Sequence, residues 1–153
     1  MSQAEFQVLH YYDGLITPLE IAALEQVSFE NPWSHASLCA ELANPLNLTS
    51  IIRIAFGSEA AGYSLTRIIP PEAELLRVAI RPRIRRQGAA TILLAGVLKK
   101  IRSLKVEKIY LEVSEKNYRA VDLYQKIGFK ITAKRRNYYD EGTTGALVMT
   151  LHL

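Results

Sequence analysis

The sequence has few of the features that mark secreted, membrane-spanning or disulfide-stabilised proteins. It contains a single cysteine, Cys39, so no disulfide can form within the chain, and a reducing compartment is the simplest expectation. No apolar run approaches the roughly 18 residues of a membrane-spanning helix. Residues 1–6 also lack the basic stretch followed by an apolar one that marks a secretion signal. We therefore expect a cytoplasmic protein that makes no contact with a membrane.

A large charge imbalance is missing as well. The formal net charge is +4 at pH 7 and charged residues make up 22% of the chain, which is typical of a folded protein. This charge suits the binding of a polyanionic small molecule, but an ordinary basic surface explains it equally well. With 153 residues, 49% of them hydrophobic, the chain can bury its own core, and we expect one domain over residues 1–153. Cys39 lies in an apolar, helical-looking stretch, which favours a small buried residue over a nucleophile.

The clearest helix boundary is a capping box formed by Thr17 and Glu20, with Pro18 in the first helical position. It predicts a helix over residues 17–28. Cap signals and apolar residues at helical spacing predict further helices over residues 34–42, 88–104 and 117–127.

Apolar runs bounded by turn residues predict the strands. They cover residues 6–8, two strands within 48–69, then 73–80, 109–113, 129–137 and 146–151. The two strands within 48–69 are expected to form a hairpin around Gly57-Ser58. Because several strands follow one another before the long helix, the strict alternation of a doubly wound fold is excluded. We expect an α/β protein with a mixed sheet flanked by about four helices.

The basic segment Arg85-Arg86-Gln87-Gly88-Ala89-Ala90 joins a predicted strand to the long helix. Its small residues would let a phosphate approach the backbone, and the free N–H groups and dipole of the first helical turn stabilise an anion. Arg83, Arg85 and Arg86 would add positive charge. Taken alone, the segment fits a phosphate-binding loop and an ordinary basic turn equally well.

A carboxylate and a phenol follow on the next strand and helix. Glu112 ends a predicted strand, Asn117 can cap the following helix, and Tyr124 lies two helical turns beyond Asn117 on the same face. The carboxylate and the phenol could serve as base and acid at a junction of sheet and helix. Because Tyr124 shares its face with Val121 and Ile127, spacing alone favours a core residue.

Together, the two motifs resemble the GNAT acetyltransferase superfamily. The phosphate loop of that superfamily reads Arg/Gln-x-x-Gly-x-Gly/Ala, here Arg85, Gly88 and Ala90. The resemblance is closest to the bacterial ribosomal-protein-alanine N-acetyltransferases and covers nearly the whole chain. The matching segments are Asn31-Pro32-Trp33-Ser34, residues 74–80, Leu111-Glu112-Val113 with Asn117, Ala120, Leu123-Tyr124 and Gly128-Phe129, and Arg136-Asn137-Tyr138-Tyr139. The fold implied is a strongly twisted mixed sheet with acetyl-CoA in a V-shaped opening between the fourth and fifth strands.

By this resemblance the chain uses acetyl-CoA as acetyl donor and needs no metal. The residues expected to hold acetyl-CoA lie on the fourth strand, in the loop and at a helix start: Val78, Ala79, Ile80, Arg85, Arg86, Gln87, Gly88, Ala89, Ala90, Thr91 and Asn117. A bulge in the fourth strand would leave a backbone N–H, that of Ile80, to polarise the thioester carbonyl.

The resemblance makes Glu112 the general base and Tyr124 the general acid, with direct attack of an amine on the thioester and no acyl-enzyme. An N-terminal amine has a reference pKa of about 7.7–8.0, so its deprotonation needs little help. A free carboxylate is a weak base, so for Glu112 we expect a raised pKa or proton transfer through water. A phenol of pKa about 10 can protonate the leaving thiolate.

Trp33, Tyr138 and Tyr139 match segments that line the acceptor side in this family, although Trp33 also fits a packing role. Gly145 and Arg81 depart from the family, which often has Asp and an acidic residue there, and both departures bear on peptide selectivity. The implied partner is an acceptor protein N-terminus, that of a small-subunit ribosomal protein beginning with alanine. A lysine or small-amine acceptor, or a non-catalytic acetyl-CoA-binding module, remain alternatives.

The basic cluster Lys134-Arg135-Arg136 has no aromatic residues interleaved with it. Stacking platforms for bases usually need such residues. We therefore expect a solvated strand face and no direct contact with nucleic acid. The sequence leaves the oligomeric state open.

Overall fold

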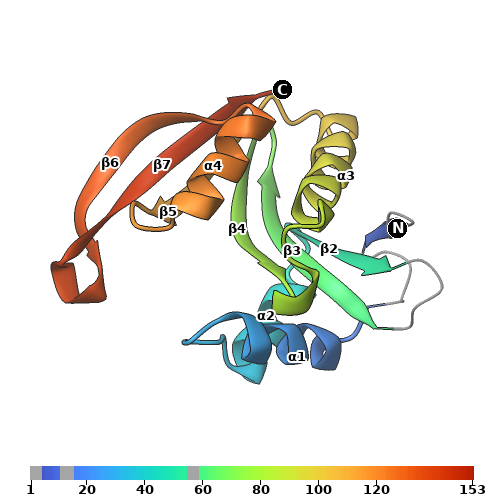
Figure 1. The fold of residues 1–153 in the computed structure, drawn as a ribbon. Helices are drawn as coiled ribbons and strands as arrows, with labels where there is room; N and C mark the ends of the chain where they lie inside the picture. Colours follow the sequence, from blue (N-terminus) through green and yellow to red (C-terminus); the bar gives the residue numbers. More distant parts are fainter. Residues whose placement is uncertain (1–4, 11–15, 55–58) are drawn as a thin grey trace.

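The computed structural model describes residues 5–10, 16–54 and 59–153, with the backbone alone for Tyr139 and Asp140. The elements follow the predicted order (Figure 1): β1 (Phe6–His10), α1 (Pro18–Ser28), α2 (His35–Ala43), β2 (Asn47–Ile54), β3 (Ala60–Ile69), β4 (Glu72–Ile80), η2 (Pro82–Ile84), α3 (Ala89–Ser103), β5 (Lys108–Ser114), α4 (Tyr118–Ile127), β6 (Lys130–Tyr139), η3 (Asp140–Gly142) and β7 (Thr144–His152). The described strands form one mixed sheet in the order β1-β2-β3-β4-β5-β7-β6. Within it β4 and β5 are parallel, and the other neighbouring pairs are antiparallel.

The helices begin where the predicted capping residues lie. Thr17 caps α1 in a complete capping box with Glu20, and the side chain of Ser34 caps α2. The side chain of Asn117 accepts a hydrogen bond from the third residue of α4, and Gly88 is the N-cap of α3 with a φ of 84°. Local chemistry at the caps therefore fixes the helix starts to within a residue or two of the predicted ones.

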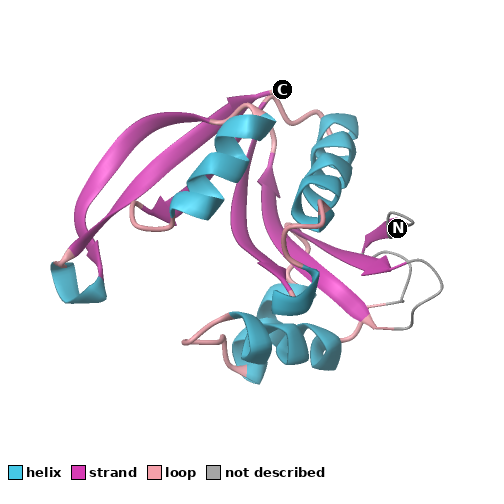
Figure 2. Ribbon diagram, in the orientation of Figure 1, coloured by secondary structure: helices cyan, strands magenta, loops and turns pink. Residues whose placement is uncertain are grey.

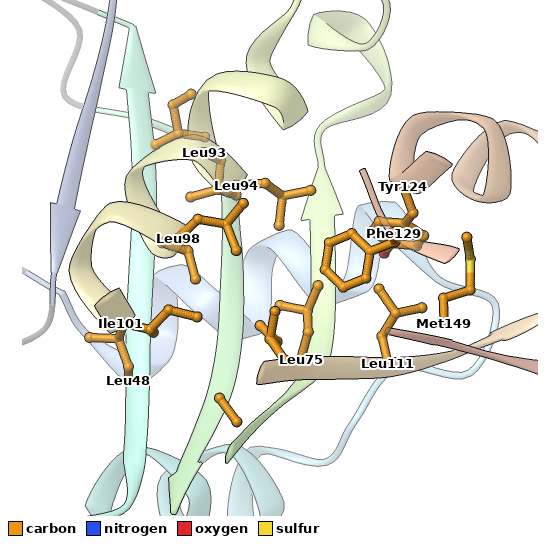
Figure 3. Close-up of a cluster of buried hydrophobic side chains, with 14 of the residues drawn as sticks. Leu48, Leu75, Leu93, Leu94, Leu98, Ile101, Leu111, Tyr124, Phe129 and Met149 are labelled. Carbon is orange, nitrogen blue, oxygen red and sulfur yellow. The ribbon is translucent and has the colours of Figure 1, made fainter. Parts of the chain in front are cut away.

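Helices lie on both sides of the sheet (Figure 2). Each side has its own apolar cluster. One cluster lies under α3 and α4, and the other under α1 and α2. Ile51 and Ile52, neighbours on β2, fall into different clusters because successive side chains of a strand point to opposite faces. Figure 3 shows the first cluster, where Leu75 of β4 lies near Phe129 and Tyr124. Tyr124 is thus a core residue, as its spacing indicated.

A β-bulge in β4 changes which of its side chains face each cluster. Leu65 and Thr66 of β3 pair with Arg77 and Leu75, so Leu76 is the extra residue. Leu75 packs in the cluster under α3, whereas Leu76 packs against the cluster under α1 and α2. Arg77 faces the same side as Leu76, because its guanidinium bonds to a carboxylate of α1. The bulge therefore turns Arg77 toward α1 and α2.

The expected bulge exists and lies at Leu76, and Ile80 pairs in regular register with Gly62. The backbone N–H of the next residue, Arg81, donates to the carbonyl oxygen of Ala61 at 2.8 Å. Because successive N–H groups of a strand point to opposite edges, the N–H of Ile80 points away from β3, toward the edge where β4 has left β5. Its part in polarising the thioester carbonyl stays a prediction.

β4 and β5 run side by side only near their starts. Their register pairs are Glu72 with Lys108, Ala73 with Ile109 and Glu74 with Tyr110. Beyond Glu74, β4 continues to Ile80 and β5 to Ser114 without further pairing between them. The parting of two parallel strands confirms the V-shaped opening that the resemblance implied.

Two further expectations concern Cys39 and the turn at Gly57-Ser58. Cys39 is half-buried on α2, not fully buried as expected, and its Sγ lies 3.6 Å from Nδ1 of His35. The buried positions of this helix are Leu38 and Leu42, and Cys39 lies beside them on the flank. The turn expected at Gly57-Ser58 lies outside the described residues. No helix in the described part of the chain is long and apolar enough to cross a membrane.

We expect Gly62→Ala to destabilise the sheet next to the opening. A Cβ at this position would lie 2.5 Å from the carbonyl oxygen of Ala79 and 3.2 Å from Cα of Ile80, so β4 would have to shift. Overpacking of this kind costs about 1–3 kcal/mol. Urea unfolding followed by circular dichroism measures the change. An unchanged midpoint and slope would show that β3 and β4 are not held this close.

Candidate active site

The opening between β4 and β5 contains two adjacent cavities. The smaller, of about 280 Å³, is lined by the later parts of both strands, and the larger, of about 480 Å³, extends toward the starts of α3 and α4. Both are lined by Phe29, Val78, Asn117, Ala120 and Tyr124. The cavities therefore adjoin along β4 and α4.

The α3 end of the larger cavity has a backbone suited to an anion. Arg86 and Gly88 both have positive φ, 64° and 84°, which turns the chain sharply before the first turn of α3. The first N–H groups of a helix have no partner within the helix, and the helix dipole is positive there. A Cβ at Gly88 would meet no atom within 4 Å, so open space lies beside this residue. This arrangement can accept a phosphate group.

Most residues predicted to hold the cofactor line the larger cavity. They are Val78, Ala79, Ile80, Arg85, Arg86, Ala89, Ala90 and Asn117. Gln87, Gly88 and Thr91 are not among its lining residues, and all three are exposed. The side-chain amide of Gln87 donates a hydrogen bond to the carbonyl oxygen of Arg83 at 3.0 Å, which holds the loop.

The arginines of this region have different partners. Arg85 lines the cavity, and its Nε donates to the carbonyl oxygen of Ile80 at 2.9 Å, which ties the loop to the end of β4. Arg83 pairs with Glu59, which also pairs with Arg81 at 3.0 Å. Arg83 does not line either cavity, so its charge is directed at Glu59 and not at the loop as expected.

Tyr124 lines both cavities although it belongs to the core. Its side chain is 9% exposed and packs edge-on against Phe129, with ring centroids 5.7 Å apart. Burial raises the pKa of Tyr124 to about 12. The phenol therefore stays protonated at neutral pH, as a proton donor must. The core and the acid interpretations of Tyr124 are compatible.

Glu112 lines the smaller cavity and pairs with an arginine that sequence reasoning assigned to a solvated strand face. Its Oε1 accepts a hydrogen bond from Nη1 of Arg135 at 2.8 Å. The guanidinium of Arg135 also lies 4.1 Å from the centre of the Tyr138 ring. Glu112 therefore lies at the cavity with one carboxylate oxygen bound to a guanidinium.

The residues predicted on the acceptor side lie in different places. Tyr138 is stacked against Arg135 and so lies next to the pair that includes Glu112. Trp33 borders a separate hollow along α2, and Phe29, from the same connection between α1 and α2, lines both cavities instead. Tyr139 belongs to β6, and its side chain lies outside the described residues.

The two departures from the family pattern have structural partners. The backbone N–H of Gly145 donates to Oε1 of Glu115 at 2.8 Å, and a Cβ there would lie 3.0 Å from Cε of Lys134. Nε of Arg81 donates to the carbonyl oxygen of Ala60 at 2.8 Å. Gly145 and Arg81 do not line either cavity, so their contacts are with residues of the surrounding structure and not with the space of the opening.

Sequence reasoning missed several residues that line the larger cavity: Ser28, Phe29, Ile84 and Arg119. A signal existed for Arg119, a basic residue in the first turn of a helix whose cap was predicted. Phe29 had no comparable signal, because its place depends on how the connection between α1 and α2 folds against β4. The same holds for Arg135, whose partner Glu112 lies on another strand.

Comparison with known proteins agrees with this geometry. Residues 19–129 match the model of the Acetyltransferase (GNAT) family. The [Ribosomal protein bS18]-alanine N-acetyltransferase of Escherichia coli (strain K12) is 29% identical over 131 residues, which cover 84% of this chain and 86% of that protein. A putative [ribosomal protein bS18]-alanine N-acetyltransferase of Bacillus subtilis (strain 168) is 30% identical over 127 residues, which cover 82% and 83%.

Solved structures show the same fold. The ribosomal-protein-S18-alanine N-acetyltransferase from Escherichia coli superposes with a TM-score of 0.83 at 26% identity, over 97% of this chain and 92% of that one. A GNAT family acetyltransferase from Elizabethkingia anophelis with acetyl-CoA bound has a TM-score of 0.75 at 19% identity, over 97% and 98%, and shows the fold alone. The fold class is that of the GNAT acetyltransferases. The chain belongs to the GNAT acetyltransferase family.

The raised pKa of Tyr124 can be tested by spectroscopic titration. Because this pKa is about 12, the phenol should not ionise appreciably between about pH 9 and pH 10.5. Tyrosinate absorbance should therefore rise equally in the wild-type protein and in Tyr124→Phe over this interval. A smaller rise in the variant would show that Tyr124 ionises like an exposed phenol.

Proposed function

We propose that the protein transfers the acetyl group of acetyl-CoA to a protein N-terminal α-amine, with the N-terminal alanine of a small-subunit ribosomal protein as the first acceptor to test. The observation that carries the proposal is that Glu112 and Tyr124 line one cavity, which adjoins a second cavity ending at the anion-binding start of α3. The names of the bS18-alanine N-acetyltransferases, similar over most of the chain, support this choice of acceptor.

The larger cavity is the proposed place for acetyl-CoA. Val78, Ala79 and Ile80 would offer the backbone of β4 to the pantetheine, and residues 86–91 would hold the pyrophosphate against the start of α3. Asn117, which lines both cavities, would contact the donor where they adjoin. Bound there, acetyl-CoA supplies a thioester whose C–S bond is exchanged for a C–N bond to the acceptor amine.

Glu112 would accept the proton of the acceptor amine through a water molecule. One oxygen of this carboxylate is already bound to Arg135, so of the two routes expected from the sequence, transfer through water is the one we propose. Tyr124 would donate its proton to the leaving sulfur and regain one through solvent. Its buried phenol stays protonated until that moment because its pKa is about 12.

Acceptors other than an N-terminal amine use the same donor chemistry. A lysine side chain or a small amine would also reach the Glu112 side of the opening, and a non-catalytic module would bind acetyl-CoA without transfer. A panel of N-terminal peptides, lysine peptides and polyamines, assayed for release of CoA thiol, separates these alternatives. Release with an alanine-terminated peptide in preference to the other acceptors supports the proposal, and binding without release favours the module.

We expect Glu112→Gln and Tyr124→Phe each to lower kcat by about 10²- to 10⁴-fold with the best peptide of the panel. Both variants remove a proton-transfer group and keep the shape of the side chain, so acetyl-CoA affinity measured by calorimetry should change little. Tyr110→Phe is the matched control, because Tyr110 bonds to Glu74 where β4 and β5 still pair. Wild-type turnover in Glu112→Gln would show that Glu112 is not the general base, and wild-type turnover in Tyr124→Phe would show that Tyr124 is not the general acid.

We expect Gly88→Val to weaken acetyl-CoA binding. The φ of 84° at Gly88 is unfavourable for a β-branched residue, so the backbone conformation at the start of α3 would change. The N–H groups of the first turn would then no longer point at the phosphate. Gly142→Val, at a φ of 90° in the turn before β7, carries similar strain away from the cavities and serves as control. Calorimetry should show a lower affinity only for the variant at Gly88, and equal affinities would contradict a phosphate site there.

A further inference from the structure

The buried carboxylate of Glu25 has no part in the chemistry proposed above. Glu25 lies on α1 with 0% of its surface exposed, and its oxygens accept hydrogen bonds from two strands of the sheet and from the connection between α1 and α2. Nε and Nη2 of Arg77 lie at 2.9 and 2.8 Å, the backbone N–H of Trp33 lies at 2.7 Å, and the Tyr63 hydroxyl donates as well. A carboxylate with so many donors is held in one place.

Glu25 and Arg77 form a buried ion pair in which both side chains stay charged. Burial alone would raise the pKa of Glu25, but hydrogen bonds from Arg77, Tyr63 and Trp33 outweigh burial and lower it below its ordinary value. Burial raises the pKa of Tyr63 well above its usual range, so its hydroxyl remains a donor to Glu25. A buried ion pair adds little stability compared with apolar residues of the same size, but it fixes geometry. Here the ion pair fixes the position of α1 and of Trp33 relative to β4.

Arg77 holds the connection between α1 and α2 from the opposite side. Its guanidinium carbon lies 3.7 Å from the ring centre of Phe29 and 5.3 Å from that of Trp33, which are cation–π distances. Nη2 lies 3.4 Å from the carbonyl oxygen of Asn31. Alternate residues of the segment 29–33 therefore contact Arg77, and Trp33 is bonded to Glu25 as well.

Phe29, the first residue of this segment, forms part of the opening. Phe29 lines both cavities, and Arg77 lines the smaller one together with Glu112 of β5. Arg77 reaches this place because the bulge at Leu76 turns it toward α1. Phe29 thus lines the same cavity as the candidate base and contacts the guanidinium that Glu25 binds.

We infer that Glu25 and Arg77 are positioning residues that fix the segment 29–33 and so hold Phe29 as part of the acceptor wall of the opening. The inference rests on the proposed function, because it assigns the smaller cavity to the acceptor. Acetyl-CoA would depend on them less, because Phe29 is the one residue of the segment 29–33 that lines the larger cavity, and the loop before α3 and the start of α4 lie outside this network.

The test compares Arg77→Met, Arg77→Lys and the double variant Glu25→Gln/Arg77→Met with the wild-type protein. The double variant removes both charges, so no unpaired charge is left buried, and the introduced glutamine keeps the shape of the glutamate side chain. We expect kcat/KM for the acceptor peptide to fall by about 10- to 100-fold through KM, with a much smaller change in acetyl-CoA affinity. Arg77→Lys should not restore activity, because an ammonium cannot bond bidentately and stack as a guanidinium does.

Trp33 is the single tryptophan of the chain, so its fluorescence reports on this segment without any activity. Quenching by acrylamide should increase in the three variants, because the ring is no longer held against Arg77. Arg53→Met is the matched control: it breaks the ion pair of Arg53 with Glu20, at 2.7 Å, which joins the start of α1 to β2. Its quenching and its acceptor kinetics should match the wild-type protein.

A double variant that unfolds cooperatively, with wild-type quenching and wild-type acceptor kinetics, overturns the inference. So does full recovery by Arg77→Lys, which would reduce the role of Arg77 to its charge. If the wild-type protein acetylates no amine, the proposed function fails, and Trp33 quenching still decides whether the pair holds the segment.

Discussion

The parting of β4 from β5 is the constraint on which the rest of the structure depends. The two strands pair over residues 72–74 and 108–110 and then diverge, so each presents backbone groups to the opening that a neighbouring strand would otherwise bind. The helices that follow these strands, α3 and α4, begin on either side of the larger cavity. The start of α3, with its unpartnered N–H groups, and the unpaired part of β4 therefore both line the larger cavity.

Ion pairs determine where the charged side chains near the opening are directed. Glu59 pairs with Arg81 and Arg83, which are therefore not directed at the loop before α3. Glu25 pairs with Arg77, and the candidate base Glu112 pairs with Arg135. Charges that are close in the sequence therefore have different partners: Arg81 and Arg83 share Glu59, whereas Arg85 bonds to the carbonyl oxygen of Ile80. The positive field at the cavity comes from the start of α3 and from the remaining arginines that line the cavity, not from the whole basic segment.

The core and the candidate site share residues, which explains why sequence reasoning found both interpretations for Tyr124. Its ring packs on Phe129 within the cluster under α3 and α4, and the residue also lines both cavities. Spacing along a helix predicts only which face a residue lies on. Whether that face meets a packed core or a cavity depends on the sheet beneath it, and here it meets both.

The sequence by itself determined the helix starts, the order of the elements and the family resemblance, because caps, turns and motif spacings are local and need no distant partner. Thr17, Ser34, Gly88 and Asn117 were all predicted in their roles at helix starts. Only the tertiary structure decided where the bulge of β4 lies, how Cys39 is buried and which acid each arginine meets. Those outcomes depend on strand register and on residues far apart in the chain, and a pattern along the sequence carries no record of that pairing.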